Sequence, residues 1–296
     1  MTSFTSPNKL PGALDFYRGR EKRFLKQVRL VFRFWLRRPF FYSQALRLNR
    51  FLNEHKVWIP LFEESPLRFH AVIYHYLDKR FGPKERVDQI ENTFSAMEKI
   101  LGPELLTTLV KEGSVVLAQH NEHLTLNLNL NNIDYLEGYF SINIQDGTTK
   151  RYYDASFGII DGNRLLVASI QGPKGEQAQE LVRQLTKDLH GMRPMFFMVD
   201  VLKLLAQAWG MTLCGIPYKR QVKIRLHGSK KVFFNYDEYW QENEGHYENE
   251  YWVMPTTLTR RPLEEIQSKK RSMYKKRYAM LDAVIAGIDQ YFPARK

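Results

Sequence analysis

The chain has a single cysteine, Cys214, among its 296 residues. One thiol cannot form an intrachain disulfide, and it cannot supply the several thiolates that a zinc or iron–sulfur centre requires. We therefore expect the protein to work in a reducing compartment, without a cysteine-held metal centre. Cys214 falls in an expected buried strand, where a small apolar role is the default.

Signals of export and of membrane insertion are also missing. The N-terminal MTSFTSPNKLPGALDF lacks the charged start, the apolar run and the small-residue cleavage site of a secretory signal. The longest nearly uncharged apolar stretch, around Met195–Met198 and Val201–Leu205, is far shorter than the roughly 20 residues that span a bilayer. These absences predict a cytoplasmic protein without a membrane-spanning helix.

Catalytic and metal-binding motifs are absent as well. The sequence has no G-x-S-x-G, and the close histidine pairs, His70/His75 and His120/His123, lack the i, i+4 spacing of a zinc-binding H-E-x-x-H helix. We therefore assign no catalytic residue, cofactor or metal from the sequence, and we leave open whether the protein is an enzyme.

Acidic residues are scarce in the first part of the chain. Residues 1–60 hold 13 Lys/Arg against 3 Asp/Glu, so they contribute +10 of the net charge of +12. A second basic segment, residues 260–277, holds eight Lys/Arg and two Glu, whereas Asp237 to Glu250 holds six acids and no Lys/Arg. This polarised charge is expected to attract anionic partners through two defined regions.

The first basic region has helical periodicity between Tyr17 and Phe40. Because the residue before a proline is disfavoured in the α region, Pro39 predicts that this helix ends at or before Arg38. Nine Lys/Arg surround its apolar stripe. The stripe consists of Phe24, Leu25, Val28, Val31, Phe32, Trp35 and Leu36.

Three uses of this helix are compatible with its spacing. The stripe can dock on the core, it can lie on an anionic membrane surface with arginines on the head groups, or the helix can belong to a nucleic-acid-binding arm. We expect residues 1–60 to form a basic arm and residues 61–296 to form one α+β domain. The candidate membrane contacts of the arm are Arg29, Arg33, Arg37 and Arg38.

The pattern changes period after a mainly helical stretch, residues 41–118, in which an amphipathic run ends at Gly102-Pro103. LTLNLNL alternates strictly, which predicts a half-buried strand over Leu124–Leu130. Asp146-Gly147 and Asp161-Gly162 then separate further alternating runs, and such pairs favour type I′ hairpin turns. The sequence therefore predicts an antiparallel meander that ends near Gln171.

Helices and short strands are expected after the meander. One helix runs to His190, a buried one follows Arg193-Pro194, and a long one extends from about Pro262 to Phe292, with strands near 212–216 and 221–226 between them. The predicted fold class is α+β, an antiparallel meander flanked by helices, with a helical N-terminal part and a long C-terminal helix.

A glycine-rich loop lies between a strand and a helix in LLVASIQGPKGEQAQELV. Such a loop can offer backbone N–H groups to a phosphate, although this one matches neither common phosphate-binding pattern and can equally be a structural turn. If the loop meets the connection HGMRP in space, the candidate anion site is Lys174, Gly175, His190 and Arg193. The order of elements also suggests an acetyltransferase-like fold using a coenzyme A thioester, although the Q/R-x-x-G-x-G/A pattern is absent.

The second basic region overlaps the long C-terminal helix, and its residues fit nucleic acid, anionic lipid or plain solvation. The candidate contacts are Lys269, Lys270, Arg271, Lys275, Lys276 and Arg277.

Four segments, SIQGPKG, TKDLHGMRP, NYDEYW and SKKRSMYKKRYAMLD, resemble in this order the VirK/YbjX family of Gram-negative bacteria. The resemblance implies a role in virulence and in resistance to cationic antimicrobial peptides, and it carries over no catalytic residue. A chain of net charge +12 repels a cationic peptide at long range, so direct sequestration would need the acidic run from Asp237 to Glu250.

We therefore expect a peripheral accessory factor on the cytoplasmic side of the inner membrane, which supports envelope integrity and peptide resistance. An acyltransferase and a nucleic-acid-binding protein are the alternatives.

Overall fold

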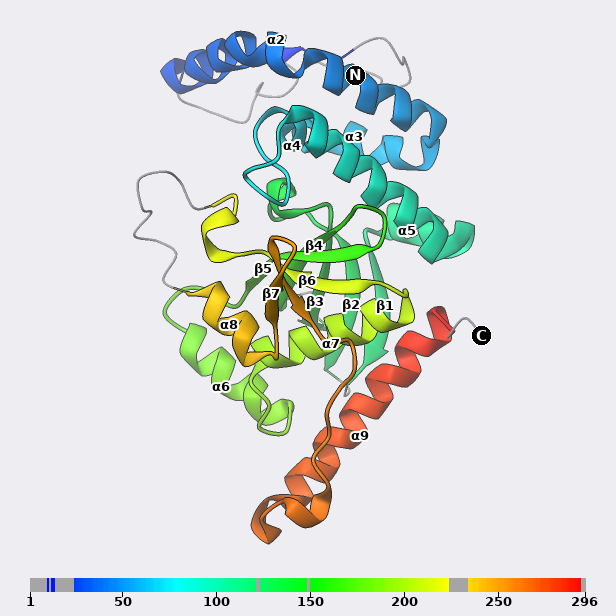
Figure 1. Ribbon diagram of the computed structural model, residues 1–296, viewed down its shortest axis with the longest axis vertical. Helices are drawn as coiled ribbons and strands as arrows, with labels where there is room; N and C mark the ends of the chain where they lie inside the picture. Colours follow the sequence, from blue (N-terminus) through cyan, green and yellow to red (C-terminus); the bar gives the residue numbers. More distant parts are fainter. Residues whose placement is uncertain are drawn as a thin grey trace.

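The computed structural model describes residues 10, 12–13, 24–120, 123–147, 150–223 and 234–293. These residues form an α+β fold around an eight-stranded sheet with the order β1-β2-β3-β4-β5-β6-β8-β7 (Figure 1). All neighbouring strands are antiparallel except β5 and β6, which are parallel. The strands are β1 (Ser114–Gln119), β2 (Leu124–Leu130), β3 (Phe140–Asp146), β4 (Arg151–Ile160), β5 (Arg164–Gln171), β6 (Thr212–Gly215), β7 (His246–Glu248) and β8 (Tyr251–Met254).

Helices surround the sheet, as the sequence predicted, with a helical N-terminal part and a long helix near the C-terminus (Figure 1). The α-helices are α2 (Phe24–Glu54), α3 (Ile59–Glu64), α4 (His70–Ile73), α5 (Pro83–Glu112), α6 (Ala178–Asp188), α7 (Pro194–Ala208), α8 (Tyr236–Glu242) and α9 (Ser268–Tyr291). Short 3-10 helices are η1 (Lys56–Trp58), η2 (Pro66–Phe69), η3 (Tyr135–Glu137), η4 (Tyr218–Arg220) and η5 (Leu263–Glu265).

The predicted meander is confirmed as strands β2 to β5. At its last turn Asp161 and Gly162 have φ of 52° and 81°, the two positive values that a type I′ turn requires. The preceding turn includes residues 148 and 149, which lie outside the described residues. Of the strand expected over 221–226, the structure describes Gln221 as an isolated bridge to Asp78, and residues 224–226 lie outside the described part.

The predicted end of the first helix was wrong, because α2 continues through Pro39 to Glu54. Proline removes one helical hydrogen bond and strains the residue before it. The loss is offset because Phe41, Ala45 and Leu48, all C-terminal to the proline, are buried in the core. The segment 17–23, also expected to be helical, lies outside the described residues.

The second half of α2 is fixed to α5. The Arg47 guanidinium is 2.5 Å from the Asp88 carboxylate and also pairs with Glu91, both on α5. α5 itself is kinked at the predicted Gly102-Pro103 boundary, where Gly102 leaves the helical region with φ 65° and ψ 174°. The expected division of the chain at residue 60 stays a prediction, although these contacts join α2 to the helix that precedes the sheet.

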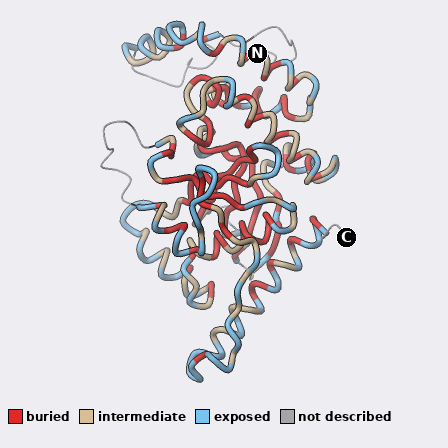
Figure 2. The backbone as a smooth tube through the Cα atoms, in the orientation of Figure 1, coloured by how far each residue is buried: buried red, intermediate tan, exposed pale blue. Residues whose placement is uncertain are grey.

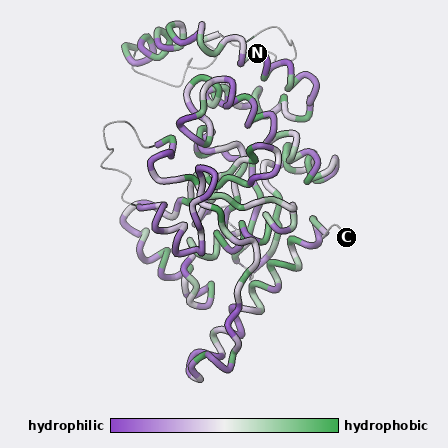
Figure 3. The backbone as a smooth tube through the Cα atoms, viewed as in Figure 1, coloured by the Kyte–Doolittle hydropathy of each residue, from purple (hydrophilic) through white to green (hydrophobic). Residues whose placement is uncertain are grey.

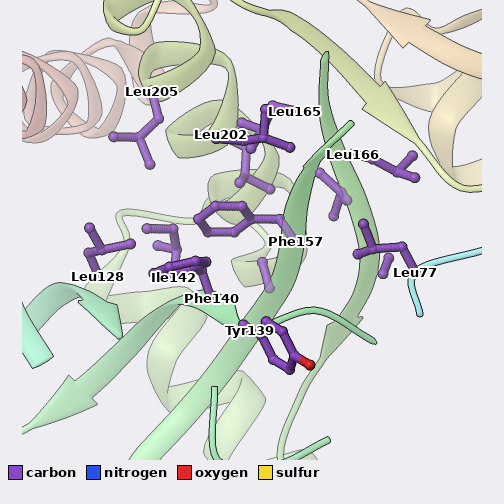
Figure 4. Close-up of a cluster of buried hydrophobic side chains, with 14 of the residues drawn as sticks. Leu77, Leu128, Tyr139, Phe140, Ile142, Phe157, Leu165, Leu166, Leu202 and Leu205 are labelled. Carbon is purple, nitrogen blue, oxygen red and sulfur yellow. The ribbon is translucent and has the colours of Figure 1, made fainter. Parts of the chain in front are cut away.

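One face of the sheet carries the apolar core. Side chains from the strands, including Ile142 and Phe157, meet Leu202 and Leu205 of α7 there (Figure 4). α7 is buried along most of its length, as predicted, and α9 packs against β1 at the same side. Figure 2 shows this buried interior as the red centre of the molecule.

The opposite face of the same strands is polar and also buried, which the sequence did not predict. β2 was expected to be half-buried, yet Asn127 and Asn129 are as inaccessible as the leucines beside them. Cross-strand neighbours continue both positions over four strands. The two ladders are Asn127–Asn143–Asp154–Gln171 and Asn129–Ser141–Ser156–Ser169.

Some of these buried groups have hydrogen-bond partners, and others have none in the described structure. Asn131 Nδ2 donates to Ser156 Oγ (3.2 Å), whereas the Ser141 hydroxyl, its neighbour on β3, is buried without a hydrogen-bond partner in the described structure. An unpaired buried hydroxyl costs about 1–3 kcal/mol. The polar face therefore contains both stabilising and destabilising serines side by side.

We predict that Ser141→Ala raises the free energy of unfolding by about 1 kcal/mol, because it removes an unsatisfied hydroxyl at almost constant volume. Ser156→Ala is the matched control, and it should lower the free energy of unfolding by about 1 kcal/mol because its hydroxyl accepts a hydrogen bond. Urea unfolding followed by circular dichroism measures both. Equal destabilisation by the two substitutions would contradict the assignment.

Candidate functional site

α2 has two apolar faces, and the one that contains most of the predicted stripe points away from the protein. Phe34 and Phe41 face inward and are buried, while Leu25, Phe32 and Leu36 on the opposite side are 81%, 65% and 63% exposed. Isolated exposed apolar residues are ordinary, but a continuous row of large ones on a helix marks an interaction surface. The outer face consists of Phe24, Leu25, Val28, Phe32, Trp35, Leu36 and Phe40.

The outer face lies at one end of the molecule's longest axis. α2 forms the top of the molecule in Figure 1, and its N-terminal half at the upper left is largely exposed in Figure 2. In Figure 3 the same half alternates hydrophobic and hydrophilic segments. A flat apolar or anionic surface can therefore approach the outer face without meeting the sheet.

Arginines follow the outer face along one flank. Arg29, Arg33 and Arg37 are four residues apart, so they share one row of the helix, and all three are exposed. None of the described carboxylates forms an ion pair with them, and Arg37 lies over the Tyr74 ring at 4.8 Å. On the other flank Arg38 stacks on Trp35 and Tyr42. The predicted membrane contacts on α2 are thus available to an external anion.

The second basic region lies at the opposite end of the molecule, on the N-terminal half of α9 (Figure 1). Lys269, Lys270, Lys275 and Lys276 are exposed, and within the described residues no carboxylate pairs with them. Arg271 donates to the Ile266 and Glu264 carbonyls, which closes the turn before α9. Because the two basic regions are at opposite ends, a flat surface that covers the outer face of α2 does not reach α9.

The predicted anion-binding residues near the glycine-rich loop do not together line the large pocket beside them. A pocket of about 610 Å³ lies between α6, α7 and α8, and Arg193 lines it together with Tyr153 and Tyr239. Lys174 and His190, which the structure describes, are not part of that lining. The common anion site stays a prediction.

Each of these residues has local partners of its own. Lys174 Nζ donates to Gln171 Oε1 (3.1 Å), and Gly175 adopts the left-handed φ of 94° at the turn before α6. The His190 carbonyl accepts from Arg277 Nη2 (3.0 Å). Burial, with the nearby His120 and the cations of α9, lowers the pKa of His190, so its ring is neutral at pH 7.

The parallel strands β5 and β6 separate part-way along β5. Pairing runs from Arg164 to Val167, and beyond that point side chains occupy the β5 edge. Gln221 Nε2 donates to the Ala168 carbonyl (3.3 Å), and the Tyr236 hydroxyl both donates to the Ile170 carbonyl (2.8 Å) and accepts from its N–H (2.9 Å). The strand edge is thus satisfied by two side chains in place of a neighbouring strand.

This split was missed from the sequence, although a signal existed. A strand, two helices and a second strand from Arg164 to Gly215 form the crossover that a parallel pair needs. Tyr236 and Gln221 come from distant segments, and their role could not be inferred without the fold. An extended ligand with amide groups could take their place, because strand edges bind peptide-like chains by hydrogen bonding.

Among the described residues, no group of three or more His, Cys, Asp or Glu could hold a metal ion. No described helix is long and apolar enough to cross a bilayer. Burial raises the pKa of the Cys214 thiol to about 11, so it stays protonated and unreactive at pH 7.

Comparison with known proteins gives a consistent family match. The family described as protein of unknown function (DUF535) matches residues 23–290. An uncharacterized protein of Haemophilus influenzae is 45% identical over 272 residues, which cover 92% of this chain and 94% of that protein. No solved structure matches the chain significantly.

Two further relatives carry names. A protein of Mannheimia haemolytica named membrane protein LapB is 33% identical over 219 residues, 73% of this chain and 94% of its own length. The uncharacterized protein YbjX of Escherichia coli is 23% identical over 277 residues, 85% of this chain and 83% of its own length. These matches confirm the family resemblance inferred from the sequence.

Proposed function

The chain belongs to the DUF535 family, and from this premise we propose that it is a peripheral accessory factor for envelope integrity, virulence and resistance to cationic peptides. In this proposal it docks on the cytoplasmic side of the inner membrane through the outer face of α2. The VirK/YbjX relationship and the name of the Mannheimia relative, a membrane protein, are consistent with this role.

The observation that carries the proposal is the combination of apolar and cationic groups on α2. Phe32, Leu36 and Phe40 can enter the acyl boundary, while Arg29 and Arg33 stay at the level of the head groups. An anionic leaflet attracts each basic residue near its surface by about 1 kcal/mol. Buried apolar area and charge together then supply the affinity, without a membrane-spanning helix.

The same apolar row could instead bind another protein, but that use would not require a row of arginines without ion-pair partners beside it. α2 has no Asp or Glu before Glu54, so its outer face presents cations only. Charges at a protein interface are matched by complementary charges on one partner, whereas membrane-surface helices keep Lys and Arg beside aromatic residues to meet many anionic head groups. This charge pattern favours an anionic lipid surface.

We predict that Arg29, Arg33 and Arg37 changed together to Glu weaken binding to phosphatidylglycerol-containing vesicles at least about 100-fold, because three attractions of about 1 kcal/mol each become repulsions. Phe32→Ser with Leu36→Ser should also weaken it, through lost apolar burial. Vesicle sedimentation at low and at 0.5 M salt measures both effects, and salt should weaken wild-type binding.

The matched control is Lys269, Lys270 and Lys275 changed together to Glu at the far end of the molecule. Both triple variants lower the net charge equally, so only the location of the charge differs. The control should retain vesicle binding, since those lysines do not face a membrane docked on α2 and are left for another anionic partner such as nucleic acid. Equal loss in both triples, or equal binding to neutral phosphatidylcholine vesicles, would refute docking through α2.

A second candidate function, acyl transfer from a coenzyme A thioester, is favoured by the split between β5 and β6. The pantetheine arm of such a donor carries amide groups that can pair with the part of β5 beyond Val167, in the place of Tyr236 and Gln221. Lys174 and the backbone around Gly175 follow directly after that strand and would meet the donor's phosphates.

We predict that the protein binds acetyl-coenzyme A. Tyr236→Phe should lower the Kd, because the variant no longer competes for the Ile170 backbone, and Lys174→Gln should raise it. Isothermal titration calorimetry measures all three proteins, and thermal melts check that each variant is folded. The absence of acetyl-coenzyme A binding by the wild type and Tyr236→Phe would remove this candidate.

A further inference from the structure

A cavity of about 330 Å³ lies between α7, α9 and the extended segment that precedes α9. The segment, residues 258–261, is held against α9 by a hydrogen bond from the Tyr278 hydroxyl to the Arg261 carbonyl (2.9 Å) and by the ion pair of Arg260 with Asp282 (2.6 Å). Cavities of this size accommodate small organic ligands. Its walls are formed by the two helices and the tethered segment, together with Met192 and Glu244 from neighbouring loops.

The charge inside this cavity is predominantly positive. Four cationic side chains line it, Lys203, Arg260, Arg261 and Arg277, against two carboxylates, Asp200 and Glu244. Lys203 is buried, and the Glu244 carboxylate that its ammonium contacts at 3.1 Å is largely exposed to solvent. Since a buried ammonium is costly unless well paired, a second anion beside Lys203 would be favourable.

Arg277 supplies an unused donor at the same place. Its Nη2 donates to the His190 carbonyl and its guanidinium lies 4.5 Å over the Tyr274 ring, so the side chain is held in one orientation. Its Nε is buried and has no hydrogen-bond partner in the described structure. Arginine presents Nε and a terminal nitrogen as a fork that fits the oxygens of a phosphate.

We infer that this cavity binds a small, soluble phosphate-bearing anion, with Arg277 and Lys203 as its principal donors. The lining cations outnumber the lining carboxylates even when Arg260 is counted as paired with Asp282, and this positive excess suits a phosphate that carries a charge near −2 at pH 7. The site is distinct from the outer face of α2, which lies at the other end of the long axis (Figure 1). A membrane docked on α2 is therefore remote from the cavity, which favours a soluble anion over a lipid head group.

Asp200 makes the site sensitive to pH. Burial raises the pKa of its carboxyl to about 6, although Lys203 and Arg277 act in the opposite direction, and Glu244 adds to the rise. Above that pKa the carboxylate offsets one cation of the cavity, and below it the carboxylate is neutral. Besides these groups, Arg260, Arg261, Tyr274 and Tyr278 line the cavity from the segment and from α9. Anion affinity should thus increase as the pH falls through about 6.

The test uses inorganic phosphate at pH 7.5, and sulfate for the pH series because its charge does not change between pH 7.5 and 5. Calorimetry on the full chain should show phosphate binding that Arg277→Gln and Lys203→Met each weaken about tenfold or more, as expected for loss of a charged hydrogen bond. Sulfate should bind more tightly at pH 5 than at pH 7.5, and Asp200→Asn should abolish this difference and tighten binding at pH 7.5.

Lys276→Gln is the matched control, since this exposed lysine adjoins Arg277 on α9 but does not line the cavity. It should leave phosphate binding within about twofold of wild type, because at pH 7.5 it removes only a screened surface charge. If Arg277→Gln fails to fold, Lys203→Met and Asp200→Asn decide the matter. Absence of phosphate binding, or equal loss in Lys276→Gln and Lys203→Met, would overturn the site.

Vesicles containing phosphatidic acid distinguish a lipid source from a soluble one. Arg277→Gln should bind them as wild type does, because the cavity is remote from α2. If Arg277→Gln lost both inorganic phosphate and these vesicles, the ligand would be a head group and the soluble assignment would be wrong. The phosphate measurements need no membrane, so they stand or fall independently of docking through α2.

Discussion

Both faces of the central sheet are buried, and this constraint organises the rest of the molecule. The apolar face supplies the core beneath α7 and α9, whereas the opposite face buries ladders of asparagine and serine. Short segments close over part of that polar face, where Leu77 packs so tightly on Gly158 that a Cβ there would lie 2.5 Å from the leucine. Hydrogen bonds between strands, such as the one from Asn127 Nδ2 to Asn143 Oδ1, offset part of the cost of burying these amides, although Asn127 Oδ1 and Asn143 Nδ2 have no partner in the described structure.

α2 has an apolar face that the core does not cover. Its inward residues, Phe34 and Phe41, extend the core, and Arg47 fixes the helix to α5 through two carboxylates. A helix that is apolar on one face only would be satisfied by this packing. α2 carries a second apolar face with a row of arginines beside it, and nothing in the described fold requires that face. Its energetic cost in water is therefore most simply explained by a partner outside the protein.

The sequence predicted the positions of strands and turns better than it predicted which of their faces are buried. Strict alternation in LTLNLNL and the Asp161-Gly162 pair identified strand and turn, because both depend on local geometry. The burial of Asn127 depends on segments far away in the chain, so periodicity assigned that face to solvent. The helix end predicted from Pro39 was wrong for a similar reason, since packing of Phe41 and Leu48 outweighs the tendency of proline to end a helix. The same limit applied to the stripe of α2, where spacing alone could not say which apolar face docks.

In the two proposals, membrane attachment and ligand binding are separated, because α2 and the cavity lie at opposite ends of the molecule. On α2 the arginines are exposed beside apolar side chains, which suits a broad, shallow surface. Around Arg277 the cavity is partly open to solvent, but Lys203 and Arg277 Nε are buried, and the lower dielectric there strengthens their interactions with an anion. If α2 rests on a bilayer, the long axis of the molecule holds the cavity in the aqueous phase, so ligand and membrane do not compete. Net charge alone would support neither proposal, because both depend on where the fold places its cations.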